Sequence, residues 1–212
     1  MEKITKSLID GGAIAVIRLA DASKLIKVAE AIYKGGVSAI EITMTVPDAI
    51  NVIKSACKEI GSYMNVGVGS VLNQETAKKA IEAGAKYVVS PIFKKEIIET
   101  AHANGVPAMP GAFSPTEIQT AFEAGADIVK VFPADVVGMA FFKGILAPMP
   151  HLRLMPTGGV TLTNAGDWLR SGACAVGVGS ALLDKKAIEA ENYEVLTENA
   201  KVLIESINKA RS

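Results

Sequence analysis

The stretch GADIVKVFPA, residues 125–134, combines a glycine turn with a short apolar run that is typical of a buried strand. A glycine just past a helix supplies the left-handed residue at which the helix ends and the chain enters a strand. Lys130 interrupts this run, although a lysine is almost never fully buried unless it is paired or used. The stretch therefore predicts a helix–turn–strand unit and, within its strand, a buried amine that needs an explanation.

Similar units recur along the chain. Seven further apolar runs resemble this one, and most follow a glycine turn such as AGAKYV or SGACAV. The eight runs cover residues 13–19, 38–44, 64–70, 86–91, 106–111, 127–133, 152–159 and 175–182. The segments between them, for example SKLIKVAEAIYKGG (23–36), repeat apolar residues at helical spacing.

Eight strands alternating with helices predict parallel βα units. In a chain of 212 residues this pattern favours an α/β fold, a single-domain (β/α)8 TIM barrel that spans residues 1–212. A doubly wound open sheet is the alternative. No linker or composition break indicates a second domain, and residues 185–212 are expected to form one or two helices packed outside.

Two helix starts can be placed from their capping residues. In SPTEI (114–118), Ser114 is the candidate cap, Pro115 suits the first turn, and Glu117 falls at the capping-box position. In NQETAKKAIEAGA, Asn73 is the candidate cap.

Composition limits the classes of partner. The 22 acidic and 22 basic residues cancel, which gives no reason to expect nucleic acid or an anionic membrane as a partner. The two cysteines and two histidines show no disulfide or metal-ligand spacing, so we expect no metal. The first residues, MEKITKSLIDGG, lack a signal-peptide core, and no run approaches the roughly 18 apolar residues of a membrane span. We expect a cytoplasmic enzyme or binding protein.

Two opposite charges are predicted to share the interior of the fold. Because side chains alternate between the two faces of a strand, Lys130 lies on the face opposite Val129 and Val131. Glu41 likewise lies on the face opposite Ile40, Ile42 and Met44. The β-branched faces suit contact with the helices, which directs Glu41 and Lys130 into the barrel.

The plain structural interpretation of this pair is a buried salt bridge. Buried ion pairs are often no better for stability than hydrophobic replacements, so a functional interpretation stands beside it. The neutral amine of a lysine is a nucleophile that can form a Schiff base with a ketone. A nearby carboxylate can move protons at the carbon next to the resulting iminium.

Two glycine clusters, PTGG (156–159) and GVGS (177–180), end the last two runs. Each leads towards a helix, where backbone N–H groups and the close approach allowed by glycine make an anion site. The loops after strands seven and eight are the usual phosphate site of a TIM barrel. A single glycine cluster is more often just a turn, but two at these places predict a phosphorylated ligand.

Five motifs carry a resemblance to a known family: EIT (41–43), GVGSVLN (67–73), VSP (89–91), KVFPADVVG (130–138) and PTGGV (156–160). In their order and spacing the chain resembles the 2-keto-3-deoxy-6-phosphogluconate (KDPG) / 4-hydroxy-2-oxoglutarate (KHG) aldolase family of class I, Schiff-base aldolases. The likeness runs from AVIR (15–18) to GVGSALL (177–183). It implies a barrel that is usually a homotrimer and that needs neither a metal nor a cofactor.

By this resemblance Lys130 is the Schiff-base lysine and Glu41 is the acid/base that works through a water. Arg18 and Ser70 look like the groups around the keto-acid carboxylate and the reacting centre, and Thr157 lines the same mouth. The implied substrate-binding residues are Arg18, Thr43, Ser70, Pro91, Phe132 and Thr157. The implied phosphate-binding residues are Gly158, Gly159, Gly179 and Ser180.

Three departures from the family pattern bear on substrate choice. Ser70 stands where threonine is commoner, which removes a methyl group and keeps the hydroxyl. Some relatives carry an arginine at the position of Thr45 and others at the position of Arg18, and this chain has only the second. GAFSP (111–115) replaces a commoner GVMTP.

The resemblance implies reversible retro-aldol cleavage of 2-dehydro-3-deoxy-6-phosphogluconate to pyruvate and glyceraldehyde 3-phosphate. Cleavage of 4-hydroxy-2-oxoglutarate to pyruvate and glyoxylate is expected as a side activity, and 2-dehydro-3-deoxy-6-phosphogalactonate is an alternative substrate. A phosphosugar isomerase or epimerase on the same barrel would need no interior lysine. A non-catalytic sensor of phosphorylated ligands would keep the pocket without turnover.

Overall fold

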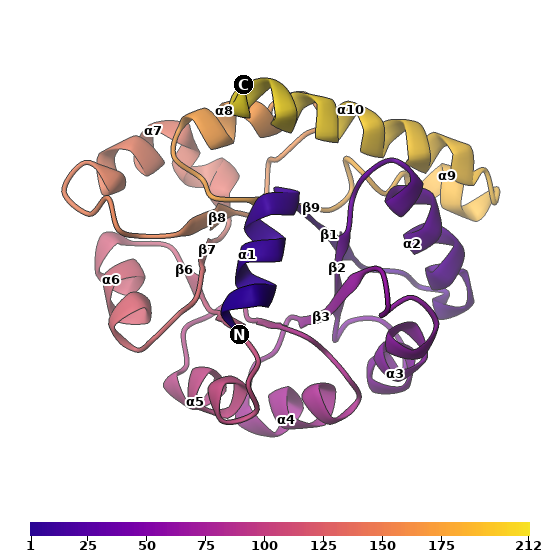
Figure 1. Cartoon of the computed structure of the whole chain (residues 1–212), viewed down its shortest axis with the longest axis horizontal. Helices are drawn as coiled ribbons and strands as arrows, with labels where there is room; N and C mark the ends of the chain where they lie inside the picture. Colours follow the sequence, from indigo (N-terminus) through magenta and orange to yellow (C-terminus); the bar gives the residue numbers. More distant parts are fainter.

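The alternation of apolar runs with amphipathic segments produces a curled parallel sheet with helices around its outside (Figure 1). The computed structural model describes all residues, 1–212. All paired strands are parallel. The strands are β1 (Ala13–Ile17), β2 (Ala39–Thr43), β3 (Asn65–Gly69), β4 (Val88–Val89), β5 (Ala108–Met109), β6 (Gly111–Ala112), β7 (Val129–Val131), β8 (Leu154–Pro156) and β9 (Val176–Val178).

Helices connect successive strands everywhere except between β5 and β6, and the predicted caps are present. Ser114 and Glu117 form the capping box of α6, and the Asn73 side chain accepts a hydrogen bond of 2.8 Å from Thr76 N at the start of α4. The expected terminal helices are α9 and α10. The helices are α1 (Glu2–Gly11), η1 (Ala22–Lys24), α2 (Leu25–Lys34), α3 (Ala49–Glu59), α4 (Gln74–Glu82), α5 (Lys95–Ala103), α6 (Pro115–Glu123), α7 (Ala134–Leu146), α8 (Ala165–Arg170), α9 (Lys185–Glu189) and α10 (Tyr193–Arg211). None of them is long and apolar enough to cross a membrane.

The eight expected strands appear as nine, because the run at 106–111 divides at Pro110. Proline has no N–H to donate to a strand ladder. The residues before it pair with β4, and the residues after it pair with β7. The hydrogen-bonded orders are β5-β4-β3-β2-β1-β9 and β6-β7-β8. Two isolated bridges, Leu154↔Ala173 and Thr157↔Gly177, join β8 to the segment that contains β9.

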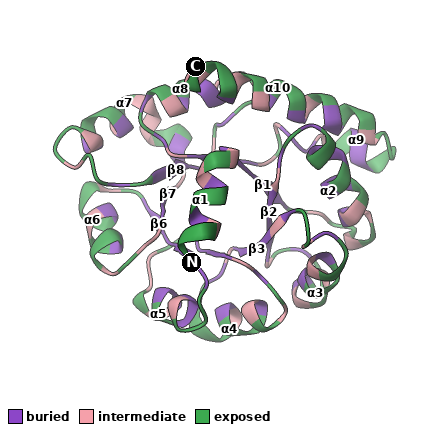
Figure 2. Cartoon of the chain, viewed as in Figure 1, coloured by how far each residue is buried: buried purple, intermediate pink, exposed green.

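The core has two parts, one on each face of the curled sheet. The larger part, of 53 buried residues, lies between the strands and the surrounding helices, and in Figure 2 helices such as α2 and α10 carry buried residues on one side and exposed residues on the other. The smaller part lines the inner face and consists of Leu8, Ile14, Ala39, Tyr87, Val89, Met109, Ile128, Met155 and Ala175. The inner face thus packs on itself and on Leu8 of α1, rather than on the layer of helices that a doubly wound sheet would have there.

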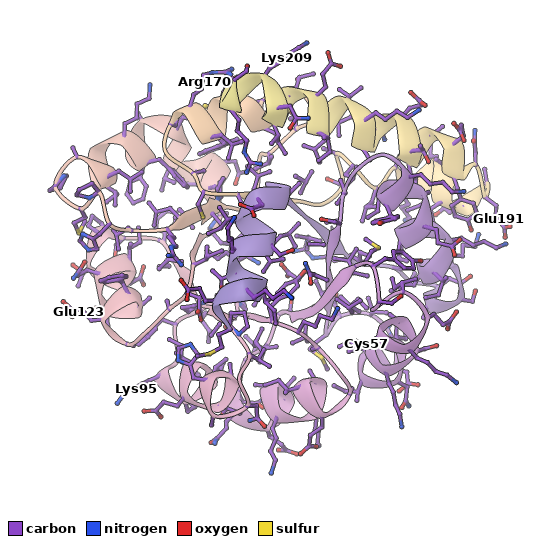
Figure 3. All side chains as sticks on the ribbon, viewed as in Figure 1. Cys57, Lys95, Glu123, Arg170, Glu191 and Lys209 are labelled. Atoms are coloured by element: carbon purple, nitrogen blue, oxygen red, sulfur yellow. The ribbon has the colours of Figure 1, made fainter.

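Charged side chains lie mainly on the outside of the helices. Figure 3 shows Lys95, Glu123, Arg170, Glu191 and Lys209 at the periphery, and all five are exposed. The buried charged side chains are Glu41 and Lys130. Their burial inside an otherwise apolar inner face marks the place where the fold departs from ordinary packing.

Candidate active site

Glu41 of β2 and Lys130 of β7 face each other across the inner face of the sheet. Lys130 Nζ lies 3.7 Å from Glu41 Oε1, and the two side chains are 3% and 1% exposed. The prediction that two opposite charges share one buried site is therefore confirmed. Neither Glu41 oxygen has a hydrogen-bond partner. Buried polar groups are normally hydrogen-bonded, so an unpartnered buried carboxylate indicates a place where a ligand is received.

Lys130 is held by the strands on both sides of it. Its backbone N–H donates to the carbonyl of Pro110 at 2.9 Å, and its strand register pairs it with Gly111 and Met155. The Phe132 ring lies on the same face of the chain, with its centroid 5.4 Å from Lys130 Nζ. The amine consequently has an aromatic ring on one side and the Glu41 carboxylate on another.

Tyr87, just before β4, closes the inner face beneath this pair. Its ring occupies the space left by Gly67, where a Cβ atom would overlap the ring. Its hydroxyl donates to the carbonyl of Ile40 at 2.5 Å. Burial, and secondarily the negative charge of Glu41, raises the pKa of Tyr87 well above its ordinary value. Sequence reasoning missed Tyr87, although glycines at period two in residues 67–69 signal a crowded inner face.

The two predicted threonines of the site differ in their hydrogen bonding. Thr157 is buried beside Gly177, and its hydroxyl oxygen has no hydrogen-bond partner. The Thr43 hydroxyl instead donates to the carbonyl of Ile17 at 3.0 Å and lies 2.7 Å from the Thr45 hydroxyl. Thr157 therefore has a free hydroxyl for a ligand, whereas that of Thr43 is already engaged in joining β2 to β1.

A cleft of about 560 Å³ opens beside the buried pair. Arg18, Gly179 and Ser180 line it, and Arg18 Nη1 lies 3.8 Å from where a Cβ of Gly179 would be. Its inner end reaches Val16, which is the register partner of Glu41 in the neighbouring strand. Lys130 is not among the lining residues, so the cleft leads towards the pair without enclosing it.

Arg18 is the unpaired cation of this cleft. Lys24 donates to the carbonyls of Ile188 at 3.2 Å and Glu189 at 3.1 Å, and Lys185 lies 3.8 Å from the Glu189 carboxylate. Arg18 is exposed and forms no ion pair. A guanidinium with unused donors is suited to an anionic group of a ligand.

Each glycine cluster leads towards a helix, which begins several residues further along the chain. Gly158 and Gly159 have φ values of 99° and 70°, and the next helix begins only at Ala165. After Gly179 the chain makes a turn, in which its carbonyl accepts from the amides of Leu182 and Leu183, before α9 begins. Gly158 and Gly159 therefore adopt left-handed turns, whereas Gly177 allows the close approach of Thr157.

Asp135, which sequence reasoning also missed, lies against the first glycine cluster. Its Oδ1 atom is 2.9 Å from where a Cβ of Gly158 would be, and its own Cβ abuts Gly159. The signal was available, since Asp135 follows the apolar run at 127–133 by two residues. The mouth of the site thus has an acidic side at Asp135 and a basic side at Arg18.

The remaining predicted residues lie just past the ends of β3 and β4. Ser70 follows β3, is half-buried and has a φ of 59° in the left-handed region. Pro91 follows β4, is half-buried and has its backbone against Gly111. The carboxyl ends of parallel strands meet at one edge of a sheet, so both residues share an edge with Thr157 and Arg18. No group of three or more His, Cys, Asp or Glu side chains is placed to bind a metal ion.

Comparisons with known proteins identify the family of this chain. Residues 4–199 match the family described as "Aldolase: KDPG and KHG aldolase". The 2-dehydro-3-deoxy-phosphogluconate aldolase of Treponema pallidum (strain Nichols) is 32% identical over 188 residues, 87% of this chain and 88% of that protein. The KHG/KDPG aldolase of Escherichia coli (strain K12) is 29% identical over 199 residues, 93% of each chain.

A solved structure places the same likeness in three dimensions. The KDPG aldolase of Legionella pneumophila, with pyruvate captured as a covalent carbinolamine intermediate, superimposes with a TM-score of 0.87. It is 25% identical, and the match covers 94% of this chain and 97% of that one. With a family match over nearly the whole chain, this protein belongs to the KDPG and KHG aldolase family.

Proposed function

We propose that this chain is a class I aldolase, a carbon–carbon lyase that cleaves 2-dehydro-3-deoxy-6-phosphogluconate reversibly to pyruvate and glyceraldehyde 3-phosphate. The observation that carries the proposal is the buried Lys130 amine, 3.7 Å from a buried carboxylate that has no hydrogen-bond partner. Family membership supplies the substrate class. Cleavage of 4-hydroxy-2-oxoglutarate is a second activity, which the KHG/KDPG aldolase at 29% identity favours.

In the proposed mechanism, the Lys130 amine attacks the C2 ketone of the substrate, and loss of water leaves a protonated imine. Glu41, acting through a water as the resemblance implies, accepts the proton of the C4 hydroxyl. The C3–C4 bond breaks, its electrons pass into the iminium to form the enamine of pyruvate, and glyceraldehyde 3-phosphate leaves. Protonation of the enamine at C3 and hydrolysis of the imine then release pyruvate and return Lys130 as the free amine.

The substrate in this proposal extends from the buried pair to the cleft. Thr157 and Ser70 are placed at the keto-acid end, where the free Thr157 hydroxyl supports the assignment. Arg18, the unpaired cation of the cleft, is assigned to the keto-acid carboxylate and the reacting centre, and the phosphate binds at Gly179 and Ser180 in the same cleft. Pro91, Phe132 and Thr43 line the same edge, and Gly158 and Gly159 complete the phosphate loops.

Further parts of the proposal concern the whole molecule. We treat residues 1–212 as one domain and the curled sheet as a closed (β/α)8 barrel, in which β5 and β6 are one strand interrupted at Pro110. The bridges between β8 and β9 support closure on the other side. A homotrimer, a cytoplasmic location and the lack of a metal, cofactor, nucleic-acid or membrane partner rest on composition and on the family resemblance.

Trapping with borohydride tests the Schiff base. Reduction in the presence of pyruvate is expected to add the pyruvate-derived mass to the peptide that contains Lys130. A Lys130→Met variant should lose both the adduct and turnover. The matched control is Lys86→Met, because Lys86 is a half-buried lysine whose amine is used in hydrogen bonds to the carbonyls of Gly61 and Met64. An unmodified Lys130 in an active preparation would contradict the scheme.

A coupled assay of pyruvate release separates the remaining substrates and functions. The compounds are 2-dehydro-3-deoxy-6-phosphogluconate, its galactonate epimer and 4-hydroxy-2-oxoglutarate. We expect the phosphogluconate compound to react fastest. Turnover of a phosphosugar that survives Lys130→Met would instead support an isomerase, and a wild type that binds phosphorylated ligands without turnover would support a sensor.

A further inference from the structure

No protein group sets the orientation of the Glu41 carboxylate by a hydrogen bond. Both of its oxygens are buried, and neither has a donor within hydrogen-bond distance. Its nearest cation, Lys130 Nζ, lies 3.7 Å away, which is longer than an ordinary N–H···O hydrogen bond. Among protein groups, the position of the carboxylate is therefore set mainly by the atoms on which it packs.

Those atoms belong to Gly69, the last residue of β3. In the register between β2 and β3, Gly67 pairs with Glu41 and Gly69 pairs with Thr43, so these four residues point to the inner face. A Cβ atom on Gly69 would overlap Oε1, Cδ and Cγ of Glu41. The Glu41 side chain therefore lies diagonally over Gly69, in the space where any other residue would have its side chain.

The two glycines of β3 have different neighbours. Gly67 leaves room for the ring of Tyr87, whereas Gly69 leaves room for the side chain of Glu41. Gly69 does not have a positive φ, so its backbone is open to any L-residue. The collision with Glu41 is then the reason that glycine is required at this position.

We propose that Gly69 is a positioning residue for the aldolase reaction, because its missing side chain seats the Glu41 carboxylate at its working distance from Lys130. The catalytic part of this inference rests on the proposed function. An alanine at position 69 displaces the carboxylate by on the order of 1 Å, and a misplacement of that size lowers turnover by about 10²-fold. Lys130 keeps its own contacts, so imine formation is retained.

The activity test uses Gly69→Ala, Glu41→Gln and the double variant. Gly69→Ala should lower kcat for 2-dehydro-3-deoxy-6-phosphogluconate by about 10²-fold, with KM changed much less, and still trap pyruvate on Lys130 with borohydride. The double variant should be no slower than Glu41→Gln, because a displaced group that no longer carries protons has nothing further to lose. Multiplicative losses in the double variant, or an unchanged kcat in Gly69→Ala, would overturn the proposal.

The matched control is Gly166→Ala in α8. A Cβ atom there would collide with the carbonyl oxygen of Ser206 in α10, away from the inner face, and Gly166 also lacks a positive φ. This variant should shift the urea midpoint of unfolding downward and leave kcat of the folded enzyme unchanged. A fall in kcat equal to that of Gly69→Ala would show that crowding a glycine anywhere has the same effect, which would overturn the proposal.

A stability measurement tests the packing of Glu41 on Gly69 without any assumption about activity. Gly69→Ala should lower the urea midpoint in the wild-type background and should not lower it when Glu41→Ala has removed the overlapping atoms. An equal loss of the urea midpoint in both backgrounds would show that Glu41 does not occupy the space above Gly69. If wild-type protein proves inactive on every aldol substrate, the proposed function fails, and this cycle still decides the geometric inference.

Discussion

Replacing Lys130 by Met should destabilise the fold, because it leaves the Glu41 charge buried without compensation. Lys130 Nζ lies 3.7 Å from Glu41 Oε1, and both side chains are almost completely buried. With an effective dielectric constant of about 20, Coulomb's law gives an attraction of about 4.5 kcal/mol at this distance. No other group donates to the Glu41 carboxylate, so nothing replaces the lost interaction. We expect Lys130→Met to lower the free energy of unfolding at pH 7 by about 3–5 kcal/mol.

The losses of unfolding free energy in Lys130→Met and Glu41→Gln should not add in the double variant. Glu41→Gln alone removes the partner of a buried ammonium and is expected to cost about 3–5 kcal/mol. In the double variant no buried charge remains, and only an amide is left unpaired, so the total cost should be about 1–3 kcal/mol. Urea unfolding of the four proteins, followed by circular dichroism, measures all three values. A Lys130→Met variant as stable as the wild type, or a double variant as unstable as the sum of the singles, would refute this account.

Three further predictions concern groups outside the reacting pair. Burial holds the phenol of Tyr87 protonated, whereas the phenol of the unfolded chain ionises near pH 10, so the free energy of unfolding should fall as the pH rises above 10. The fall should be less steep in Tyr87→Phe. Equal dependence of the unfolding free energy on pH in the two proteins, measured by urea titrations, would count against this prediction. Burial raises the pKa of the Cys174 thiol from 9.0 to about 12. Its alkylation by iodoacetamide at pH 8.5, followed by peptide mass mapping, should therefore be roughly 10³-fold slower than that of an ordinary thiol. Labelling at the ordinary rate would contradict the raised pKa. Ser114→Ala removes one half of the α6 capping box and should lower the free energy of unfolding by about 1 kcal/mol, with no change expected in aldol turnover, whereas an unchanged urea midpoint would show that the cap is unimportant.

The local parts of the fold were predictable because they depend on neighbouring residues. The capping box at Ser114, the cap at Asn73 and the two terminal helices follow from short-range hydrogen bonding and helical periodicity. The run at 106–111 was predicted as one strand but is divided, since the missing N–H of Pro110 matters only once β4 and β7 lie on either side of it. The strand propensity of residues 106–111 was read correctly, but the pairing of the two halves with different strands was not foreseen.

The same division holds within the candidate site. Alternation along two strands was enough to predict that Glu41 and Lys130 face one interior, because the side-chain period of a strand is two wherever the strand lies. It was not enough to find Tyr87 beneath them or Asp135 beside Gly158, since those contacts join distant segments. The sequence indicated that the glycine clusters lead towards helices, but not that these helices begin several residues later.

The repeating units, the inward-facing charged pair and the family can be recognised from residue order and from motifs along the chain. The 3.7 Å separation of the reacting pair, the free hydroxyl of Thr157 and the packing of Glu41 on Gly69 become visible once the chain is folded. The physical reason is that a glycine in a sequence shows only that a side chain is missing. Which group fills the vacated space is set by packing between strands that are distant along the chain.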